Sequence, residues 1–135
     1  MDIEKLQNIK QKALKDNIPI IMDDTLEEIK RELKDNPPKN VLEIGAAVGY
    51  SAICFCEFLS ANGKIDTIER DVERIKQAKI NIKEMGLEDR ITLYEGDAIE
   101  ILPQLEGKYD MIFIDAAKGK YPFFLKEALR MLDKN

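Results

Sequence analysis

Val41-Leu-Glu-Ile-Gly-Ala-Ala-Val-Gly-Tyr-Ser51 is the stretch of sequence that decides the fold. It begins with the nearly continuous apolar run of a strand that is covered on both faces. Gly45 and Gly49 then allow a tight turn and a close approach of the backbone to a ligand. A helix that starts near Tyr50 would point its free N–H groups and the positive end of its dipole at that ligand. The stretch therefore predicts a cofactor pocket at the end of a buried strand.

Outward from this stretch, strands and helices alternate along the chain. Hydrophobic periodicity and turn residues predict strands at 41–45, 64–69, 90–94 and 109–114. They predict helices near 50–61, 71–85 and 121–132, and a short helix that follows Gly96-Asp97 and ends at about residue 102. This alternation predicts an α/β fold, a Rossmann-like doubly wound parallel sheet of four strands. We expect residues 1–36 to form two N-terminal helices on the substrate side and residues 37–135 to form the cofactor-binding domain.

Two details of the helices can be compared with a structure. Asp24 or Thr25 is expected to cap the second N-terminal helix. The helix over 71–85 is expected to end at Gly86 and to turn a buried stripe inward, formed by Val72, Ile75, Ala78, Ile82 and Met85.

Composition limits the classes of function that are open to the chain. Its 135 residues are enough for one domain, and a net charge of −5 with a pI near 4.9 argues against a broadly basic nucleic-acid-binding surface. No signal peptide or membrane-spanning run is visible, so a cytoplasmic location without membrane contact is expected. The absence of histidine excludes His-based catalysis and most zinc sites. Cys54 and Cys56 lie two apart on an expected helix, which indicates unpaired core residues in a reducing compartment.

Carboxylates follow the expected strands at the edge where such sheets bind ligands. These residues are Glu43, Glu69, Asp97 and Asp115. Glu69 falls 24 residues after Gly45, where an acidic side chain typically accepts hydrogen bonds from the hydroxyls of an adenosine ribose. The alternative is that Glu69 is a surface residue that precedes a helix.

The glycine turn also indicates which ligand is bound. Gly45-x-x-x-Gly49 lacks the third glycine of the dinucleotide pattern, and the alternative role of such a turn is close packing of helix and strand. Glu43 would repel a pyrophosphate but suit a cationic ligand. A ligand with adenosine at one end and a cationic amino acid at the other fits these residues, and S-adenosylmethionine is such a ligand.

The end of the fourth expected strand carries candidates for the reaction itself. Asp115 could bind Mg²⁺ or Ca²⁺, which prefer oxygen ligands, or could cap a helix. Lys118 could act as a base if burial or a metal lowers its pKa, or could be an ordinary solvated lysine.

With these residues in view, the chain resembles the class I S-adenosylmethionine-dependent methyltransferases. More narrowly, it resembles the metal-dependent O-methyltransferases that include catechol and caffeoyl-CoA O-methyltransferases and bacterial tRNA 5-hydroxyuridine methyltransferases. The motifs that carry this resemblance are Leu42-Glu-Ile-Gly-Ala-Ala-Val-Gly-Tyr-Ser-Ala52, Thr67-Ile-Glu-Arg-Asp71, Gly96-Asp-Ala98, Phe113-Ile-Asp-Ala-Ala-Lys-Gly-Lys-Tyr121 and the Ile18-Pro-Ile-Ile-Met-Asp lead-in.

The resemblance implies roles for individual residues. Those implied to bind S-adenosylmethionine are Glu43, Gly45, Ala46, Gly49, Tyr50, Ser51, Glu69, Arg70, Asp97, Ala98 and Asp115. Asp115 is also implied to ligate a divalent metal such as Mg²⁺, and Lys118 to accept the proton of the acceptor hydroxyl. Residues near Ile21 and Met22 would line the methyl end of the cofactor. The implied reaction is methyl transfer to a hydroxyl of tRNA 5-hydroxyuridine or of a small catechol-like compound.

The resemblance also indicates what this chain lacks. The family continues with three more strands and an Asp-Asn pair that completes the metal site, so we expect a C-terminally truncated member. The fourth strand would then be an apolar sheet edge through which copies could associate into a homo-oligomer. A non-catalytic cofactor-binding or assembly module is the alternative function, and a nicotinamide-dependent dehydrogenase is disfavoured by the missing third glycine.

Overall fold

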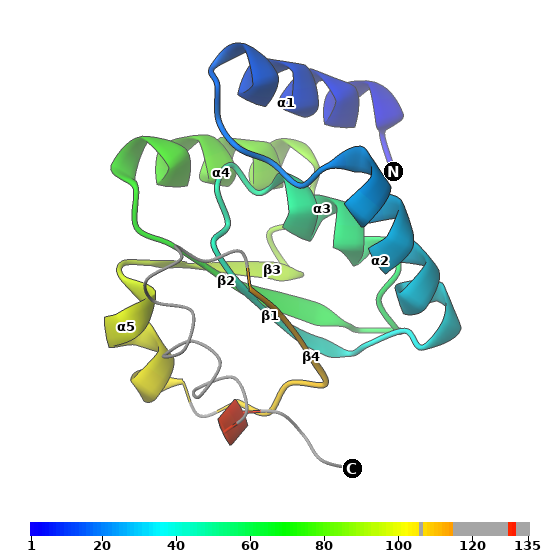
Figure 1. Ribbon diagram of the computed structural model, residues 1–135, viewed down its shortest axis with the longest axis vertical. Coiled ribbons are helices and arrows are strands. Elements are labelled where there is room, and N and C mark those ends of the chain that lie inside the picture. Colours follow the sequence, from blue (N-terminus) through cyan, green and yellow to red (C-terminus); the bar gives the residue numbers. More distant parts are fainter. Residues whose placement is uncertain (106, 115–129, 132–135) are drawn as a thin grey trace.

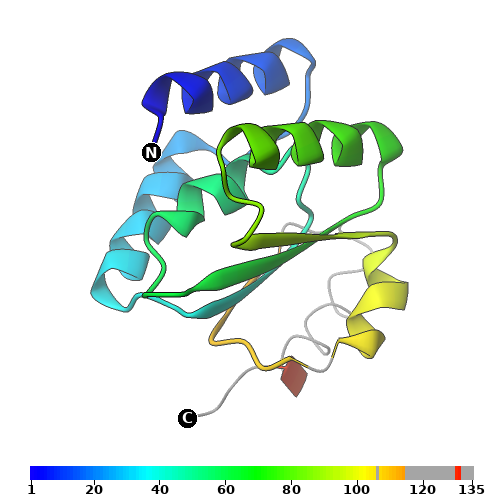
Figure 2. The same ribbon diagram turned by 180° about the vertical axis from the view of Figure 1, so that it is seen from behind.

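The computed structural model describes residues 1–105, 107–114 and 130–131 of the chain. Figure 1 shows a central sheet with helices on both faces, and Figure 2 shows the same arrangement from behind. The predicted α/β fold is confirmed.

Two helices, α1 (Ile3–Lys15) and α2 (Asp23–Asp35), precede the sheet. They bury Ile9 and Ala13 of α1 and Leu26 and Leu33 of α2 in the same apolar core as α3. Each helix follows the 3.6-residue period with a narrow buried stripe and charged residues elsewhere. The prediction of an Asp24 or Thr25 cap is wrong, because α2 begins at Asp23 and has Met22 at the N-cap without a side-chain bond.

The first half of the sheet follows the predicted strand–helix alternation. It consists of β1 (Asn40–Ile44), α3 (Tyr50–Cys56), β2 (Lys64–Glu69) and α4 (Val72–Glu84). Helix α3 is shorter than expected, because the chain turns at residues 57–59 and is drawn back to β1 by a hydrogen bond from Ser60 N to Pro38 O of 2.9 Å.

Helix α4 presents most of its predicted buried stripe to the core. Ile75, Ala78 and Ile82 are buried, and Gly86 follows the helix with a positive φ of 70°, as expected for a residue that ends a helix. Val72 is the exception, because this first residue of α4 is 64% exposed.

The second half consists of β3 (Ile91–Glu95), α5 (Ala98–Ile101), the short 3₁₀ helix η1 (Leu102–Gln104) and β4 (Met111–Ile114). Strand β4 begins later than predicted, because Tyr109 leaves the ladder and donates its N–H to Met131 O at 3.0 Å. The expected helix over 121–132 falls mainly outside the described residues.

All four strands are parallel, in the order β3-β2-β1-β4. Helices α3 and α4 pack on one face together with Val41, Ile65 and Ile91, while α5 and η1 pack on the other against Leu42 and Ile68. Because the strands are parallel, their carboxyl ends meet at one edge of the sheet, where ligands bind in folds of this kind.

No helix among the described residues is long and apolar enough to cross a membrane. Cys54 and Cys56 are both buried and unpaired, as predicted. Burial raises the pKa of the Cys54 thiol to about 11 and that of the Cys56 thiol to about 12.

Candidate functional site at the carboxyl ends of the strands

The glycine turn after β1 is held in place from two sides. Gly45 N and Ala46 N both donate to Ile68 O of β2, at 3.0 and 2.9 Å, and Asn81 Nδ2 of α4 donates to Val48 O at 2.8 Å. Gly45 and Gly49 have positive φ values of 99° and 85°, which glycine adopts most readily. The turn is therefore held by hydrogen bonds with β2 and α4.

Glu43 lies below the turn at the centre of a buried polar network. Its side chain is fully buried, and its two carboxylate oxygens accept hydrogen bonds from the hydroxyls of Ser51 and Thr67. The Thr67 bond measures 2.7 Å from Oγ1 to Oε1. Because the Ser51 hydroxyl donates its proton to Glu43, the Ser51 oxygen can offer only lone pairs to a ligand.

Glu69 ends β2 and is only 8% exposed. Its Oε1 accepts the Ala47 N–H at 2.7 Å, and its Oε2 accepts the N–H groups of Arg70 and Asp71, both at 3.1 Å. A carboxylate has about four acceptor positions, so these three bonds orient Glu69 and leave it capacity for a ligand hydroxyl. Glu69 also ties the turn after β1 to the end of β2.

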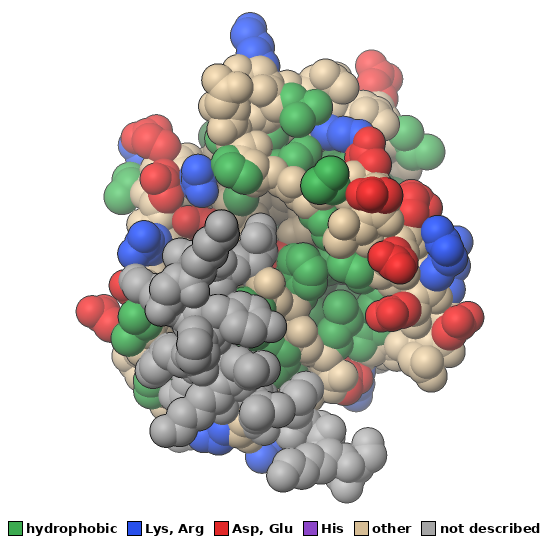
Figure 3. Space-filling view, viewed as in Figure 1, with side chains coloured by type: hydrophobic (Ala, Val, Ile, Leu, Met, Phe, Trp, Pro, Cys, Tyr) green, Lys and Arg blue, Asp and Glu red, His purple; other side chains and the backbone are tan. Residues whose placement is uncertain are grey.

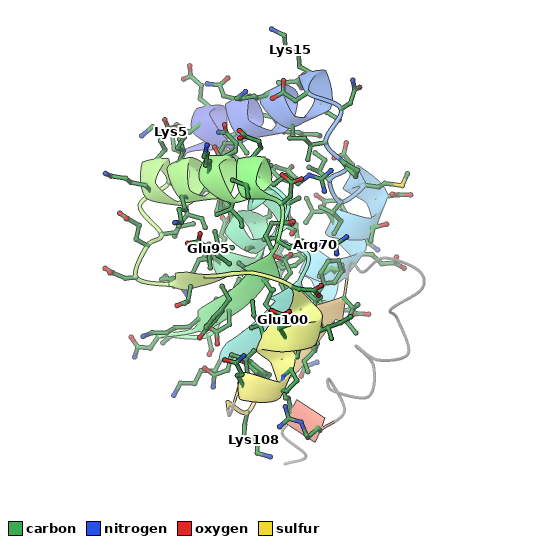
Figure 4. All side chains as sticks on the ribbon, turned by 90° about the vertical axis from the view of Figure 1, so that its left-hand side faces the viewer. Lys5, Lys15, Arg70, Glu95, Glu100 and Lys108 are labelled. Carbon is green, nitrogen blue, oxygen red and sulfur yellow. The ribbon has the colours of Figure 1, made fainter. Side chains whose placement is uncertain are left out.

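Arg70, Asp97 and Ala98 lie at the ends of β2 and β3. Asp97 caps α5 by accepting the Ile99 N–H at 2.9 Å, and its other oxygen lies 3.8 Å from Arg70 Nη1. Figure 4 labels Arg70 in the space between α4 and α5. The bond of 2.8 Å from Gly96 N to Glu69 O places this group directly beside Glu69. The structure thus brings the predicted ribose and adenine residues together.

A narrow crevice opens at the end of β1 and brings distant segments together. The turn residues from Gly45 to Ala47 line it with Tyr50, Ser51 and Phe113, and so does the segment 19–21 that leads into α2. Ile21 and Ser51 therefore line the same crevice. Met22 does not line the crevice and is 69% exposed.

Two predicted reaction residues, Asp115 and Lys118, lie outside the described residues. Within the described part of the chain, no three His, Cys, Asp or Glu side chains come close enough together to hold a metal ion. The predicted metal site and proton acceptor thus stay predictions.

Three contributions to this site are not foreseen from the sequence. Thr67 and Asn81 are polar residues buried in a strand and a helix, and the backbone N–H of Ala47 binds Glu69. Inward-facing polar residues within apolar patterns are the signal that could have identified Thr67 and Asn81, because buried polar groups need a partner.

Comparison with known proteins adds a family relationship. A family model described as O-methyltransferase matches residues 3–135. A catechol O-methyltransferase of Niastella koreensis is 42% identical over 97 residues, which cover 69% of this chain and 44% of that protein. A caffeoyl-CoA O-methyltransferase of Eucalyptus globulus is 33% identical over 99 residues, which cover 70% of this chain and 40% of that protein. The chain spans roughly half the length of these curated relatives.

Solved structures agree with this comparison. An O-methyltransferase from Bacillus cereus in complex with SAH superposes with a TM-score of 0.88 at 28% identity, covering 96% of this chain and 62% of that one. The O-methyltransferase TomG from Streptomyces achromogenes, in complex with SAM, superposes with a TM-score of 0.87 at 26% identity, covering 96% of this chain and 61% of that one.

Proposed function

The chain belongs to the O-methyltransferase family, and from this membership we propose that it binds S-adenosylmethionine and serves methyl transfer to a hydroxyl group. The observation that carries the proposal is the pair of buried acidic residues at neighbouring strand ends. Glu43 holds Ser51, and Glu69 is held by three backbone N–H groups beside the adenine-side residues.

The acceptor and donor groups of the site fit this cofactor. Glu69 can only accept hydrogen bonds, and its remaining acceptor position suits a hydroxyl group of a ribose. The Ser51 oxygen, with its proton donated to Glu43, accepts from an ammonium group such as that of the methionine end. Asp97 and Ala98 lie beyond Glu69, on the side where the adenine would extend.

The bound cofactor would supply an electrophilic methyl group. The residues of this chain then bind and orient it, so that the acceptor oxygen can approach the methyl group in line. We assign the removal of the acceptor's proton to Lys118. Assistance by Mg²⁺ at Asp115 is part of the proposal, and Mg²⁺ titration tests it.

We propose a small catechol-like hydroxyl compound as the acceptor. Helix α2, which follows the crevice segment, carries six acidic and three basic residues in its thirteen. Figure 3 shows acidic side chains along this side of the molecule and hydrophobic side chains beside them in the middle of the face. Such a surface repels a polyanion, so a tRNA acceptor is less favoured. A cytoplasmic location is part of the proposal.

A different class of function is a non-catalytic cofactor-binding or assembly module. Among the described residues, β4 pairs only with β1, so its second edge has no described partner. We propose that two copies can associate through this edge, and small-angle scattering that gives a monomer at all concentrations would contradict this.

The proposed cofactor site is tested by calorimetric titration of the chain with S-adenosylhomocysteine, with and without Mg²⁺. We expect saturable binding by the unaltered chain and a loss of at least about tenfold in affinity for Glu69→Ala, since charged hydrogen bonds are lost. Glu73→Ala is the matched control, because Glu73 lies in the first turn of α4 with a largely exposed side chain. Binding that is equally strong in both variants would refute the role of Glu69. An absence of binding would favour the assembly module.

A further inference from the structure

A second cavity, larger than the crevice at Ser51, lies on the face of the sheet that α5 and η1 cover. This cavity, the lower groove, has a volume of about 580 Å³. Its walls are formed by Asp66 and Tyr94 from the sheet, by Ile101, Gln104 and Leu105 from the α5–η1 segment, and by Tyr109 before β4. In Figure 4, α5 with the labelled Glu100 lies below β3 with the labelled Glu95, so the sheet side and the helix side of the groove can be followed there. The groove shares no residue with the crevice at Ser51.

The polar lining of the lower groove offers mainly hydrogen-bond acceptors. Tyr109 donates its hydroxyl proton to Asp66 Oδ2 at 2.8 Å, so its oxygen can only accept a further bond. Gln104 donates through Nε2 to Glu100 O at 2.9 Å and keeps its side-chain carbonyl. With the Asp66 carboxylate, the side chains of the groove therefore offer more hydrogen-bond acceptors than donors. The remaining side-chain donors are the Tyr94 hydroxyl and one Gln104 amide hydrogen.

The charge of the groove also favours a ligand that donates hydrogen bonds. Asp66 is half-buried, and none of the described Lys or Arg residues lies within salt-bridge distance of it. Burial raises the pKa of the Asp66 carboxyl, while the Tyr109 hydrogen bond and the charge of Lys64 oppose this effect. A half-buried carboxylate of this kind is stabilised by an arriving cation.

The apolar part of the lining favours an organic cation over a metal ion as the ligand. Ile101 and Leu105 are partly buried, pack against the apolar core that contains Leu42 and Ile68, and form one wall of the groove. Glu95 also lines the groove but pairs with Lys79 at 2.6 Å. Asp66 is then the one lining carboxylate without such a described pair, and one carboxylate is a poor site for a hard divalent cation, which needs six or more oxygen ligands.

We propose that the lower groove binds a small organic cation with a primary ammonium group and an apolar body. The ammonium donates its three hydrogens to Asp66, Tyr109 and Gln104, and the apolar body packs on Ile101 and Leu105. The size of the groove lies within the range of small-molecule pockets.

Titration with benzylammonium, followed by ¹H–¹⁵N NMR in the presence of saturating S-adenosylhomocysteine, tests this proposal. The lower groove does not depend on the cofactor site, so the titration is also done without S-adenosylhomocysteine. Binding of benzylammonium there would support the groove proposal even if the cofactor proposal fails. We expect saturable shifts at Gly107 and at the Gln104 side-chain amide, and much weaker binding of the neutral analogue benzyl alcohol.

Two variants give the experiment its control. Asp66→Asn keeps an acceptor for Tyr109 and removes the charge, so the affinity for benzylammonium is expected to fall by at least about tenfold. Glu100→Gln removes an exposed carboxylate of α5 that does not line the groove, and the affinity is expected to stay within about twofold. Circular dichroism verifies that both variants fold.

The proposal is overturned if no saturable binding is found at about 10 mM ligand, which leaves less than about 3 kcal/mol of binding free energy. Equal binding of benzyl alcohol or an unchanged affinity in Asp66→Asn would also overturn it. Shifts confined to residues 45–51 would likewise overturn it, because the ligand would then occupy the crevice of the cofactor site.

Discussion

Thr67→Val tests the buried network on which the cofactor site rests. Valine matches the shape of threonine and removes only the hydroxyl that donates to Glu43 at 2.7 Å. Thr67 and Glu43 are both fully buried, so water cannot replace this donor easily. A hydrogen bond to a charged group contributes roughly 1.5–3 kcal/mol, and we expect the free energy of unfolding to fall by about 2 kcal/mol. For a chain of this size the melting temperature would fall by about 6 °C.

Denaturant unfolding in a double-mutant cycle checks the origin of this loss. In a Glu43→Gln background the same change removes a bond to a neutral amide, and we expect a loss of only about 1 kcal/mol. Thr92→Val is the control, because Thr92 lies exposed on β3 and its change should stay within about 0.5 kcal/mol. Equal losses in both backgrounds, or a Thr67→Val loss as small as that of the control, would refute the charged hydrogen bond.

Three further predictions concern other parts of the fold. Gly49→Ala should lower the free energy of unfolding, measured in urea, by about 1–2 kcal/mol, because Gly49 has a φ of 85° that alanine adopts only with strain. The added methyl group would meet only ordinary contacts, so no steric loss adds to this value. An unchanged midpoint would contradict the backbone argument. The pKa of Asp66 is higher in the folded chain than in the unfolded chain. Its protonated carboxyl therefore stabilises the fold below the unfolded pKa, and this stabilisation is lost as the pH rises through the folded pKa. Asp66→Asn should therefore stabilise the fold at pH 7 relative to pH 4 in thermal unfolding, and a variant that gains nothing at pH 7 would contradict it. Because burial raises the pKa of Cys54 to about 11 and of Cys56 to about 12, both thiols should react with Ellman's reagent at pH 8 only after unfolding. Fast reaction of the native chain would show that these residues are accessible.

The strand positions were predictable because their apolar runs and glycine turns are local signals. β2 lies at the predicted residues, while the bounds of α3 and β4 differ because tertiary hydrogen bonds set them. Ser60 N binds Pro38 O and Tyr109 N binds Met131 O, and neither partner can be read from the neighbouring sequence.

The individual site residues were predictable only in part. The motif that contains Glu69 identified it as an acidic residue at a strand end. The N–H groups that orient it come from the turn after β1 and from the two residues before α4. Glu43 was expected to meet the ligand directly, whereas the structure buries it beneath Ser51. The roles of Asp115 and Lys118 rest on the sequence alone.

The sequence by itself determined the parallel α/β fold, the glycine turn and the acidic residues at the strand ends, because these depend on periodicity and on the backbone freedom of single residues. The tertiary structure alone decided how these residues are joined. Thr67 meets Glu43 because β1 and β2 pair with Glu43 opposite Thr67. In the wall of the lower groove, Tyr109 donates its hydroxyl proton to Asp66, which lies 43 residues earlier in the chain. Such contacts depend on strand register and on the packing of segments far apart in the chain, which no local pattern encodes.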